Sequence, residues 1–292
     1  MSVGSELVVE RWRAVKKRVD AAIEEALRGL PEANAVEAAR YIAMGGKRLR
    51  AFIVVEVATA LGADLEEALD AAVAVELVHA ASLALDDIID EDVVRRGSEA
   101  AWVRYGVKKT VMVSNLLIPY AQQMVSNRYG PEALRRTVKA WLDISRGEVM
   151  DAFMPPGPDG EAYLEMIRLK TGALFRLSSE LGVLAAKRPD LLPLASEYGE
   201  TIGIVYQIAD DIRDSRDPEK VAREPSLRLF KKWAPTEEKA LAAMRAFLEK
   251  ARELADRFLG TIDTVVKIIP EFVVSAMLGP GLVTRRSPGA QG

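Results

Sequence analysis

Between Gly62 and Gly97 the chain contains neither glycine nor proline, the residues that most often interrupt a helix. Apolar side chains recur in this stretch every three or four residues, at Leu65, Leu69, Val73, Leu77, Ala80 and Ala84. That spacing matches the 3.6-residue period of an α-helix. Asp64 and Glu67 form a capping pair at its expected start. The stretch therefore predicts one long helix with the character of a buried segment.

Helical periodicity continues through most of the remaining chain, and no segment alternates with a period of two over the length of a strand. The other predicted helices span residues 6–28, 32–44, 48–61, 107–128, 131–150, 160–186, 190–216 and 235–258. Their connections are short, which favours one helical bundle over domains joined by linkers. We therefore predict an all-α fold with a single domain over residues 1–292 and a flexible tail at about 285–292.

Composition excludes several classes of protein. Apolar residues make up 49% of the 292 residues and charged residues 28%, with a formal net charge of −3. These values are ordinary for a globular protein, and the chain lacks the basic block that marks nucleic-acid binders. There is no cysteine, and His79 is the single histidine, so a zinc site or a histidine-based triad is not expected.

Targeting signals are also missing from the sequence. The N-terminus is charged from the start and does not resemble a signal peptide. No uninterrupted apolar run reaches the ~18 residues that a membrane span requires. We therefore expect a soluble, cytoplasmic protein.

Two acidic clusters interrupt apolar helical sequence, "DDIID" at 86–90 and "DDIRD" at 210–214. In each, two aspartates lie four residues apart on one helical face and a third lies at its edge: Asp86, Asp90 and Asp87, then Asp210, Asp214 and Asp211. Solvated helix faces would explain one such cluster. Two clusters embedded in apolar sequence favour Mg²⁺, which prefers oxygen ligands and bridges carboxylates to phosphates. Two facing rows would hold several ions around a diphosphate.

Basic residues at the helix breaks supply the fixed cations that a diphosphate site needs. Each alone is better explained as a surface charge, but together with the acidic pairs they favour phosphate binding. They occur in "GGKRLR", "RRG" and "KTGALF", and the residues concerned are Lys47, Arg50, Arg95, Arg96, Lys170 and Thr171.

This set of motifs resembles the trans-isoprenyl diphosphate synthases, the polyprenyl synthetase family, and within it the geranylgeranyl type. The resemblance runs from "GGKRLR" through "ELVHAASLALDDIIDEDVVRRG" and "KTGALF" to "YQIADDIRD", over roughly residues 40 to 215. It implies the isoprenoid synthase fold, an antiparallel helical bundle around a deep central cavity. It also implies a homodimer that binds small isoprenyl diphosphates.

The resemblance also implies residue roles. Asp86, Asp90 and Asp210 would bind Mg²⁺, with Asp87 and Asp214 supporting the metal site. The allylic diphosphate would be held by Arg95, Lys170, Thr171 and Gln207, and isopentenyl diphosphate by Lys47, Arg50, His79 and Arg96. Helical spacing agrees, because His79 lies seven residues before Asp86 and Gln207 three before Asp210.

The implied reaction is head-to-tail prenyl transfer. Mg²⁺ and the basic groups stabilise the departing allylic diphosphate, and the double bond of isopentenyl diphosphate attacks the resulting carbocation. The released diphosphate then takes up a proton, and an apolar cavity keeps water from the cation.

The chain departs from the family pattern at four places. The loop after the second motif lacks the usual glycine–lysine pairs, and none of its lysines sits in the family's pattern: Lys220, Lys231 and Lys232. Glu148 stands where glutamine is common, and Leu85 where many members have histidine. "VSNLL" at 113–117 replaces a glycine–aspartate pair. These changes imply altered substrate preference or lower activity.

Product length is predicted from the residues about one helical turn before Asp86, where bulky aromatics in the family stop growth early. Here those residues are small, Ala81 and Ser82, with Val78 a turn deeper. We therefore expect products of twenty carbons or more, geranylgeranyl diphosphate first and a twenty-five-carbon product as the alternative. Ala81→Phe is expected to shorten the product.

Three other functions stay open at the level of sequence. A class I terpene cyclase shares the magnesium chemistry but has a different second motif. A head-to-head condensing enzyme and a weakly active or silent subunit of a hetero-oligomer are the others. In the tail, Arg285 and Arg286 could shield bound diphosphate, although a solvated end is the simpler interpretation.

Overall fold

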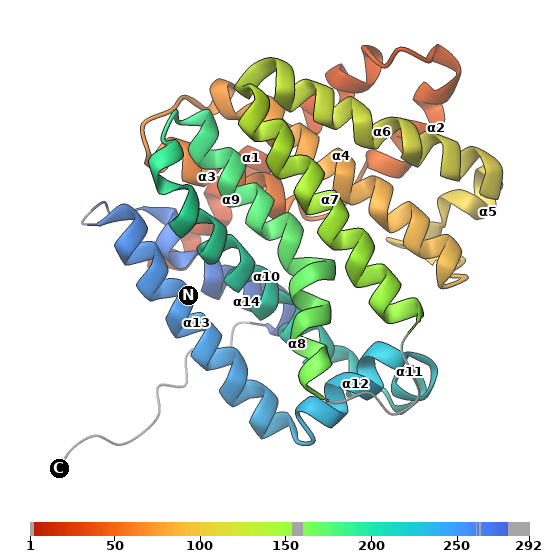
Figure 1. Cartoon of the computed structure of the whole chain (residues 1–292), viewed down its shortest axis with the longest axis vertical. Coiled ribbons are helices and arrows are strands. Elements are labelled where there is room, and N and C mark those ends of the chain that lie inside the picture. Colours follow the sequence, from red (N-terminus) through yellow and green to blue (C-terminus); the bar gives the residue numbers. More distant parts are fainter. Residues whose placement is uncertain (1–2, 154–159, 261, 263, 280–292) are drawn as a thin grey trace.

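A computed structural model describes residues 3–153, 160–260, 262 and 264–279, so the predicted tail at 285–292 lies outside the described residues. Within these ranges helices follow one another from end to end (Figure 1). The first half holds α1 (Val3–Arg28), α2 (Val36–Ala43), α3 (Leu49–Ala60), α4 (Leu65–Ile89), α5 (Ala101–Tyr105), α6 (Val107–Tyr129) and α7 (Pro131–Ala152). The second half holds α8 (Glu161–Ile167), α9 (Ala173–Ala185), α10 (Leu192–Asp214), α11 (Pro218–Arg223), α12 (Pro225–Trp233), α13 (Glu237–Leu259) and α14 (Ile269–Leu278).

Shorter elements connect these helices. Single helical turns are η1 (Ala33–Ala35), η3 (Pro189–Leu191) and η4 (Val265–Ile268), and a π-helical turn, η2 (Arg168–Gly172), joins α8 to α9. The strands of the described residues form one antiparallel hairpin, β1 (Val94–Arg95) with β2 (Ser98–Glu99). The all-α fold class predicted from the sequence is confirmed.

The long helix predicted between Gly62 and Gly97 is α4, and its capping box between Asp64 and Glu67 is present. It ends at Ile89, before the run of three acids at 90–92, because negative charge is unfavourable at a helix C-terminus. Sequence periodicity also missed α11 and α12, each of which has a proline in its first turn, the position where proline favours a helix start.

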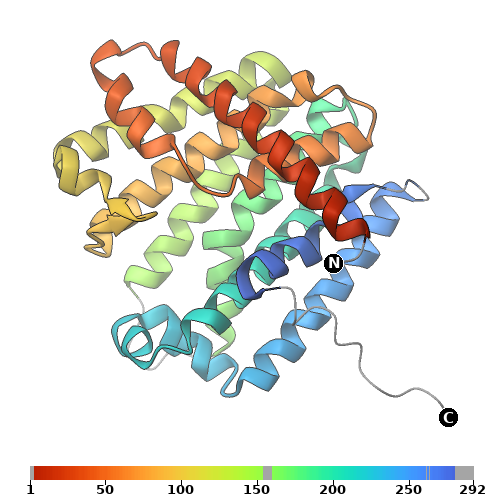
Figure 2. The same ribbon diagram turned by 180° about the vertical axis from the view of Figure 1, so that it is seen from behind.

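Helix α4 lies at the centre of the bundle. It packs against α6 and α9 on the side seen in Figure 1 and against α1 and α2 on the side seen in Figure 2. By length and composition alone α4 could cross a membrane, but 78% of its most apolar window is buried inside the protein. Its apolar character is therefore that of a core helix.

The core consists of two apolar clusters that meet along α10. Tyr198 and Ile202 belong to the larger cluster around α4, whereas Val205 and Ile208 belong to a smaller one with α8, α12 and α13. Each fully buried side chain of this size contributes about 1.5–3 kcal/mol relative to exposure. Helix α10 is thus fixed from both sides, which holds the acidic motif at its end in a defined place.

Candidate active site

A cavity of about 420 Å³ lies between the start of α3 and helices α4, α7 and α10, a size typical of small-molecule sites. Most of the residues singled out in the sequence line it, although they come from four separate parts of the chain. They are Lys47, Arg50, His79, Ser82, Asp86, Arg95, Arg96, Lys170, Thr171, Gln207 and Asp210. The predicted substrate residues are therefore brought together in one place.

The first acidic row, on α4, faces a second pair of acids on α7. Lys170 bridges that pair, with its Nζ 2.7 Å from Oε2 of Glu148 and 3.0 Å from Oδ2 of Asp151. The pKa of Asp86 is raised to about 8, chiefly by burial and also by the nearby Glu148 and Asp90, against the lowering effect of Lys170. Burial also raises the pKa of Glu148, so these two neighbouring carboxyl groups titrate as a pair.

The second acidic row lies in the last turn of α10. Arg213 contacts Asp210, and its Nε donates to Oδ1 of Asp214 at 2.8 Å. Lys220 on α11 donates to the other oxygen of Asp214 at 3.0 Å. Burial alone would raise the pKa of Asp214, but these two cations hold it below its usual value. Burial raises the pKa of Asp210, which lies deeper in the cavity.

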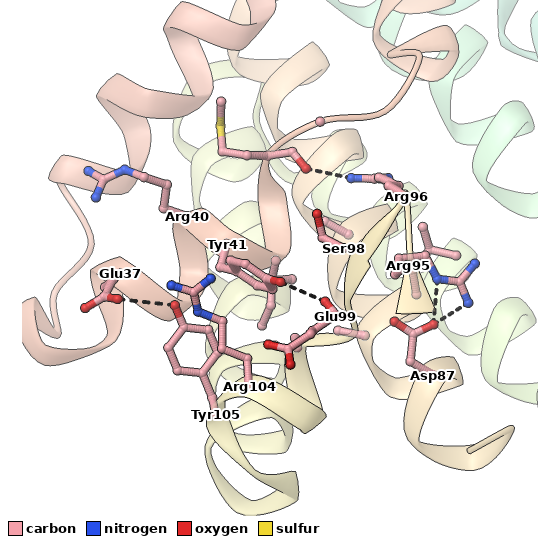
Figure 3. A pocket seen from close by; sticks show the side chains of 17 residues that line it. Glu37, Arg40, Tyr41, Asp87, Arg95, Arg96, Ser98, Glu99, Arg104 and Tyr105 are labelled. Carbon is pink, nitrogen blue, oxygen red and sulfur yellow. Dashed lines mark hydrogen bonds and ion pairs between the residues drawn. The ribbon is translucent and has the colours of Figure 1, made fainter. Parts of the chain in front are cut away.

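The middle aspartate of each motif points away from the cavity. Asp87 accepts a hydrogen bond from Arg95 Nε at 2.6 Å, in a neighbouring cavity on the adjacent face of α4 (Figure 3). Asp211 is buried, where Tyr163 donates to it at 2.6 Å and Gln207 at 2.9 Å. Burial raises the pKa of Asp211 to about 7. Both residues orient neighbours that line the cavity, and neither faces it.

The neighbouring cavity has a volume of about 480 Å³ and lies between α2, α4, α5 and the β-hairpin. Figure 3 shows Tyr41 and Tyr105 on one of its walls, where the guanidinium of Arg104 stacks 4.6 Å from the Tyr41 ring centre. Arg95 and Arg96 line both cavities, so they form part of the wall between them.

The π-helical turn η2 carries Lys170 and Thr171 into the cavity. Thr171 donates a hydrogen bond to Oε1 of Gln207 at 2.7 Å. Two glycines allow the neighbouring helices to approach this turn: a Cβ at Gly147 on α7 would lie 2.6 Å from the Lys170 backbone nitrogen. A Cβ at Gly203 on α10 would lie 2.7 Å from the backbone of the same turn. The position of Lys170 therefore depends on two close backbone contacts.

The opposite wall of the cavity is basic. Arg50 is buried, lies 4.5 Å from the Phe175 ring centre, and hydrogen-bonds Nε2 of His79 at 3.1 Å. Burial and the surrounding arginines hold the pKa of His79 well below 6.5, so the ring is neutral and Nε2 accepts this hydrogen bond. The Nε of Arg50 has no hydrogen-bond partner among the described residues. A buried guanidinium with an unused donor is costly, and an anion in the cavity would satisfy it.

The basic loop before α3 is held by a buried arginine in left-handed conformation. Arg48 has φ 55° and donates to Asp20 Oδ1 and to the carbonyl of Ala43, both at 2.8 Å. Its third partner, Glu76, also accepts from the backbone nitrogen of Ala51 at 3.1 Å and so caps the start of α3. This network fixes the loop that presents the cavity cations.

The remaining cations lie at the rim of the cavity. Arg96 donates to the Met44 carbonyl at 2.8 Å and lies close over Gly46, where a Cβ would be 3.0 Å from the guanidinium carbon. Lys47 donates to the carbonyl of Ala276 on α14 at 3.1 Å. Sequence spacing did not predict that α14 would reach this part of the site.

Of the three residues expected to floor the cavity, only Ser82 lines it. Ala81 and Val78 are fully buried and do not line it, because the face of α4 that carries them is covered by neighbouring helices. The apolar side chains that do line the cavity are Leu49, Leu83, Ile144 and Leu174.

Three charged residues of the site were not assigned to it from the sequence. Glu148 and Asp151 lie three residues apart in "GEVMDA", a spacing that places both on one helical face and could have revealed them. Arg213 lies inside the second acidic motif itself. Its salt bridges to both ends of the motif follow from side-chain conformation, which spacing alone does not give.

The donor set was compared with the needs of a divalent metal. In the ranges that the structure describes, no three acidic or histidine side chains converge into a ready-made metal cage. Mg²⁺ usually takes one or two carboxylates and completes its coordination with waters and substrate phosphates. Asp86 on α4 and Asp210 on α10, which line one cavity, offer the oxygen ligands of an ion that binds together with a diphosphate.

Comparison with known proteins identifies the family. The profile described as "Polyprenyl synthetase" matches residues 32–227, more than half of the chain. The chain is 33% identical over 276 residues to the hexaprenyl pyrophosphate synthase of Saccharolobus solfataricus, covering 93% of this chain and 96% of that protein. It is 35% identical over 223 residues to the geranylgeranyl diphosphate synthase of Methanosarcina mazei, covering 73% and 69% of the two chains.

A solved structure agrees with the sequence relatives. The geranylgeranyl pyrophosphate synthetase from Pyrococcus horikoshii superposes with a TM-score of 0.78 at 26% identity, covering 94% of this chain and 98% of that one. The helical bundle described above is thus the isoprenoid synthase fold. The chain therefore belongs to the polyprenyl synthetase family of trans-isoprenyl diphosphate synthases and is a prenyltransferase that elongates prenyl chains.

Proposed function

We propose that this enzyme condenses isopentenyl diphosphate with an allylic diphosphate, head to tail and with Mg²⁺, and that its main product is geranylgeranyl diphosphate. The observation that carries the proposal is the cavity between the two acidic rows, in which Arg50 keeps an unused buried donor. A single cavity with acidic groups at one side and basic groups at the other suits two diphosphates, one bound through metal and one bound directly.

On the acidic side we assign the allylic diphosphate. Asp86 and Asp90 on α4 and Asp210 on α10 would hold Mg²⁺ against its oxygens, with Asp214 in support. Bound Mg²⁺ would supply charge stabilisation for the departing diphosphate. The substrate residues on this side are Arg95, Lys170, Thr171 and Gln207, of which Thr171 and Gln207 are already hydrogen-bonded to each other.

Lys170 is the cation best placed to act on the leaving group. Burial would lower its pKa, but the carboxylates of Asp86, Glu148 and Asp151 raise that pKa well above its usual value, so it stays charged. An arriving diphosphate offers oxygens that compete with Glu148 and Asp151 for its Nζ. Lys170 thus stabilises negative charge as the carbon–oxygen bond breaks.

On the basic side we assign isopentenyl diphosphate to Lys47, Arg50, His79 and Arg96. Arg50 contributes a fixed positive charge, and the neutral His79 orients it through the hydrogen bond at 3.1 Å. The apolar wall formed by Leu83, Ile144 and Leu174 excludes water from the carbocation. The proton released in the last step goes to the departed diphosphate, so no protein base is required.

Product length is the most detailed part of the proposal. Ser82 is small and lines the cavity, which leaves room for an allylic chain longer than fifteen carbons. The relatives include both a geranylgeranyl and a hexaprenyl synthase, so longer products are the alternative. We favour geranylgeranyl diphosphate because the cavity of about 420 Å³ lies at the small end of the range for ligand sites.

The test is to incubate the purified protein with isopentenyl and farnesyl diphosphates, with and without Mg²⁺, and to separate the products by chain length. A linear twenty-carbon diphosphate that requires metal supports the proposal. A longer linear product corrects the length alone. A hydrocarbon would indicate a cyclase or head-to-head enzyme, and no turnover would indicate a silent subunit.

We further propose that the enzyme is a homodimer. Val138, Leu142 and Val149 form an exposed apolar stripe along one face of α7, and Met112 is exposed on the adjacent α6. Such a stripe is typical of a surface that a second copy covers. We also propose that the chain acts as one domain, because α10 contributes to both apolar clusters.

A further inference from the structure

The second acidic row contains a cation of its own. Arg213, inside "DDIRD", contacts Asp210 and donates through Nε to Oδ1 of Asp214 at 2.8 Å. Lys220 takes the other oxygen of Asp214 at 3.0 Å. The oxygens that would bind a divalent ion are therefore already engaged by side chains of the same chain.

The first acidic row is compensated differently. Its cation, Lys170, comes from the π-helical turn and bonds to Glu148 and Asp151 on α7. Among the described residues Asp86 forms no salt bridge, and it lines the cavity. The two rows have the same spacing but differ in one respect. In the row on α10, an arginine of the same motif bridges the two aspartates, whereas the first motif contains no such arginine.

Arg213 is also able to leave this position. Its side chain is 43% exposed, and its salt bridges are confined to the two acids of its own motif. A rotation about its side-chain bonds would free Asp210 and one oxygen of Asp214, whose other oxygen stays with Lys220, without disturbing the core. The same rotation would keep a guanidinium, which suits bidentate phosphate contact, close to the mouth of the cavity.

We propose that Arg213 is the built-in counter-ion of the second acidic row: it competes with the divalent ion for Asp210 and Asp214, and gives way when a diphosphate arrives. This inference rests on the proposed function. It makes the two rows unequal, because metal binds the first row more readily and the second row only together with substrate. Arg213 is a positioning residue in this scheme, since it acts through the two carboxylates.

The first test measures metal binding in the absence of substrate. Mn²⁺ is titrated into the purified wild-type enzyme and into Arg213→Leu, and free Mn²⁺ is counted by electron paramagnetic resonance. Removing a unit positive charge a few ångströms from a divalent ion should tighten binding at one site about tenfold even at the dielectric constant of water. Arg213→Lys, which keeps the charge, should remain close to wild type.

Arg216→Leu is the matched control. Arg216 lies two residues beyond the end of α10. Its guanidinium forms a salt bridge with Glu237 at 2.7 Å and not with the acidic row. The variant loses the same charge from the same end of α10 and should bind Mn²⁺ as the wild type does. An equal gain in both variants would overturn the proposal, because the effect would then reflect net charge alone.

A double variant places the effect at the second row. Adding Asp210→Asn to Arg213→Leu should abolish the gain, and a gain that persists would show that the tighter site lies elsewhere and overturn the proposal. Unchanged Mn²⁺ binding in a folded Arg213→Leu, checked by circular dichroism, would also overturn it. Failure of the wild type to elongate farnesyl diphosphate would instead refute the proposed function, which the metal titration does not measure.

Discussion

His79 is half-buried beside Arg50, and its pKa is lowered first by desolvation and then by four neighbouring arginines. A histidine held neutral in this way is an acceptor for the neighbouring guanidinium and not a proton donor. Its role in the site is therefore to fix Arg50, which a hydrogen-bond acceptor of another kind could also do.

The pH dependence of stability follows from the same surroundings. Because the folded-state pKa of His79 lies below 6.5, its contribution to stability is fully present above pH 6.5 and is lost as the pH falls through the folded-state value. His79→Gln removes this contribution and should lose less stability than the wild type below pH 6.5. Urea unfolding of both proteins from pH 8 to pH 4.5 measures the difference, and parallel curves would contradict it.

We expect Arg50 to lower the stability of the folded protein while it supports substrate binding. Its guanidinium is buried beside a neutral histidine with one donor unused, so Arg50→Met should raise the free energy of unfolding by about 1 kcal/mol. The same change should weaken isopentenyl diphosphate binding about ten- to a hundredfold, through loss of a charged contact. Thermal unfolding and steady-state KM measure the two effects, and a destabilised variant would contradict the first of them.

Ser82 offers a residue-scale test of product length. Ser82→Phe places a ring in the cavity and should shift the main product to fifteen carbons or fewer. Chromatography measures this after incubation with isopentenyl diphosphate and either dimethylallyl or geranyl diphosphate. Ala81→Phe, the change that the sequence alone favoured, should mainly destabilise the protein, because Ala81 is fully buried outside the cavity. An unchanged product from a folded Ser82→Phe would argue against this floor.

At the scale of elements, the π-helical turn η2 is the part of the site most sensitive to packing. Gly147→Ala would bring a Cβ within 2.6 Å of the Lys170 backbone nitrogen, so the turn must shift. A displacement of about 1 Å in a catalytic group can cost 10²-fold in rate, and we expect a loss of kcat of that order. Gly29→Ala, where the new Cβ meets its nearest atoms at 3.4 Å, is the control that should keep full activity.

The helices show how much of the fold could be predicted from the sequence. Apolar spacing located the long helices to within a few residues, and the spacing of four residues within each acidic motif placed Asp86 and Asp210 in one cavity. The π-helical turn has no periodic signal, since it lies inside one continuous helical pattern. The direction of Asp87 could not be predicted either, because it depends on Arg95 in a hairpin that periodicity does not reveal.

The sequence could not predict which residues of α4 line the cavity, because packing by neighbouring helices decides this. Ala81 and Val78 lie close to Ser82 along α4, yet packing against neighbouring helices removes them from the cavity. Spacing along one helix gives the angle of each side chain about the axis. Spacing does not show which helix packs on that side, because this depends on the tertiary structure.

For the whole molecule, the exposed stripe on α7 predicts a dimer. Leu142 is 58% exposed in the single chain, and Leu142→Glu should convert a dimer into a monomer, as measured by light scattering during gel filtration. Leu7→Glu changes a similarly exposed apolar residue on α1 and should leave the dimer intact. A wild-type protein that is already monomeric would contradict the prediction.

The shared wall between the two cavities has a consequence for inhibition. Arg95 and Arg96 can also be reached from the neighbouring cavity, one wall of which carries Tyr41 and Tyr105. An uncharged aromatic compound that stacks on these rings would lie beside both guanidiniums without imitating pyrophosphate. Medicinal chemistry could then avoid the highly charged, poorly permeant scaffolds that a diphosphate mimic demands.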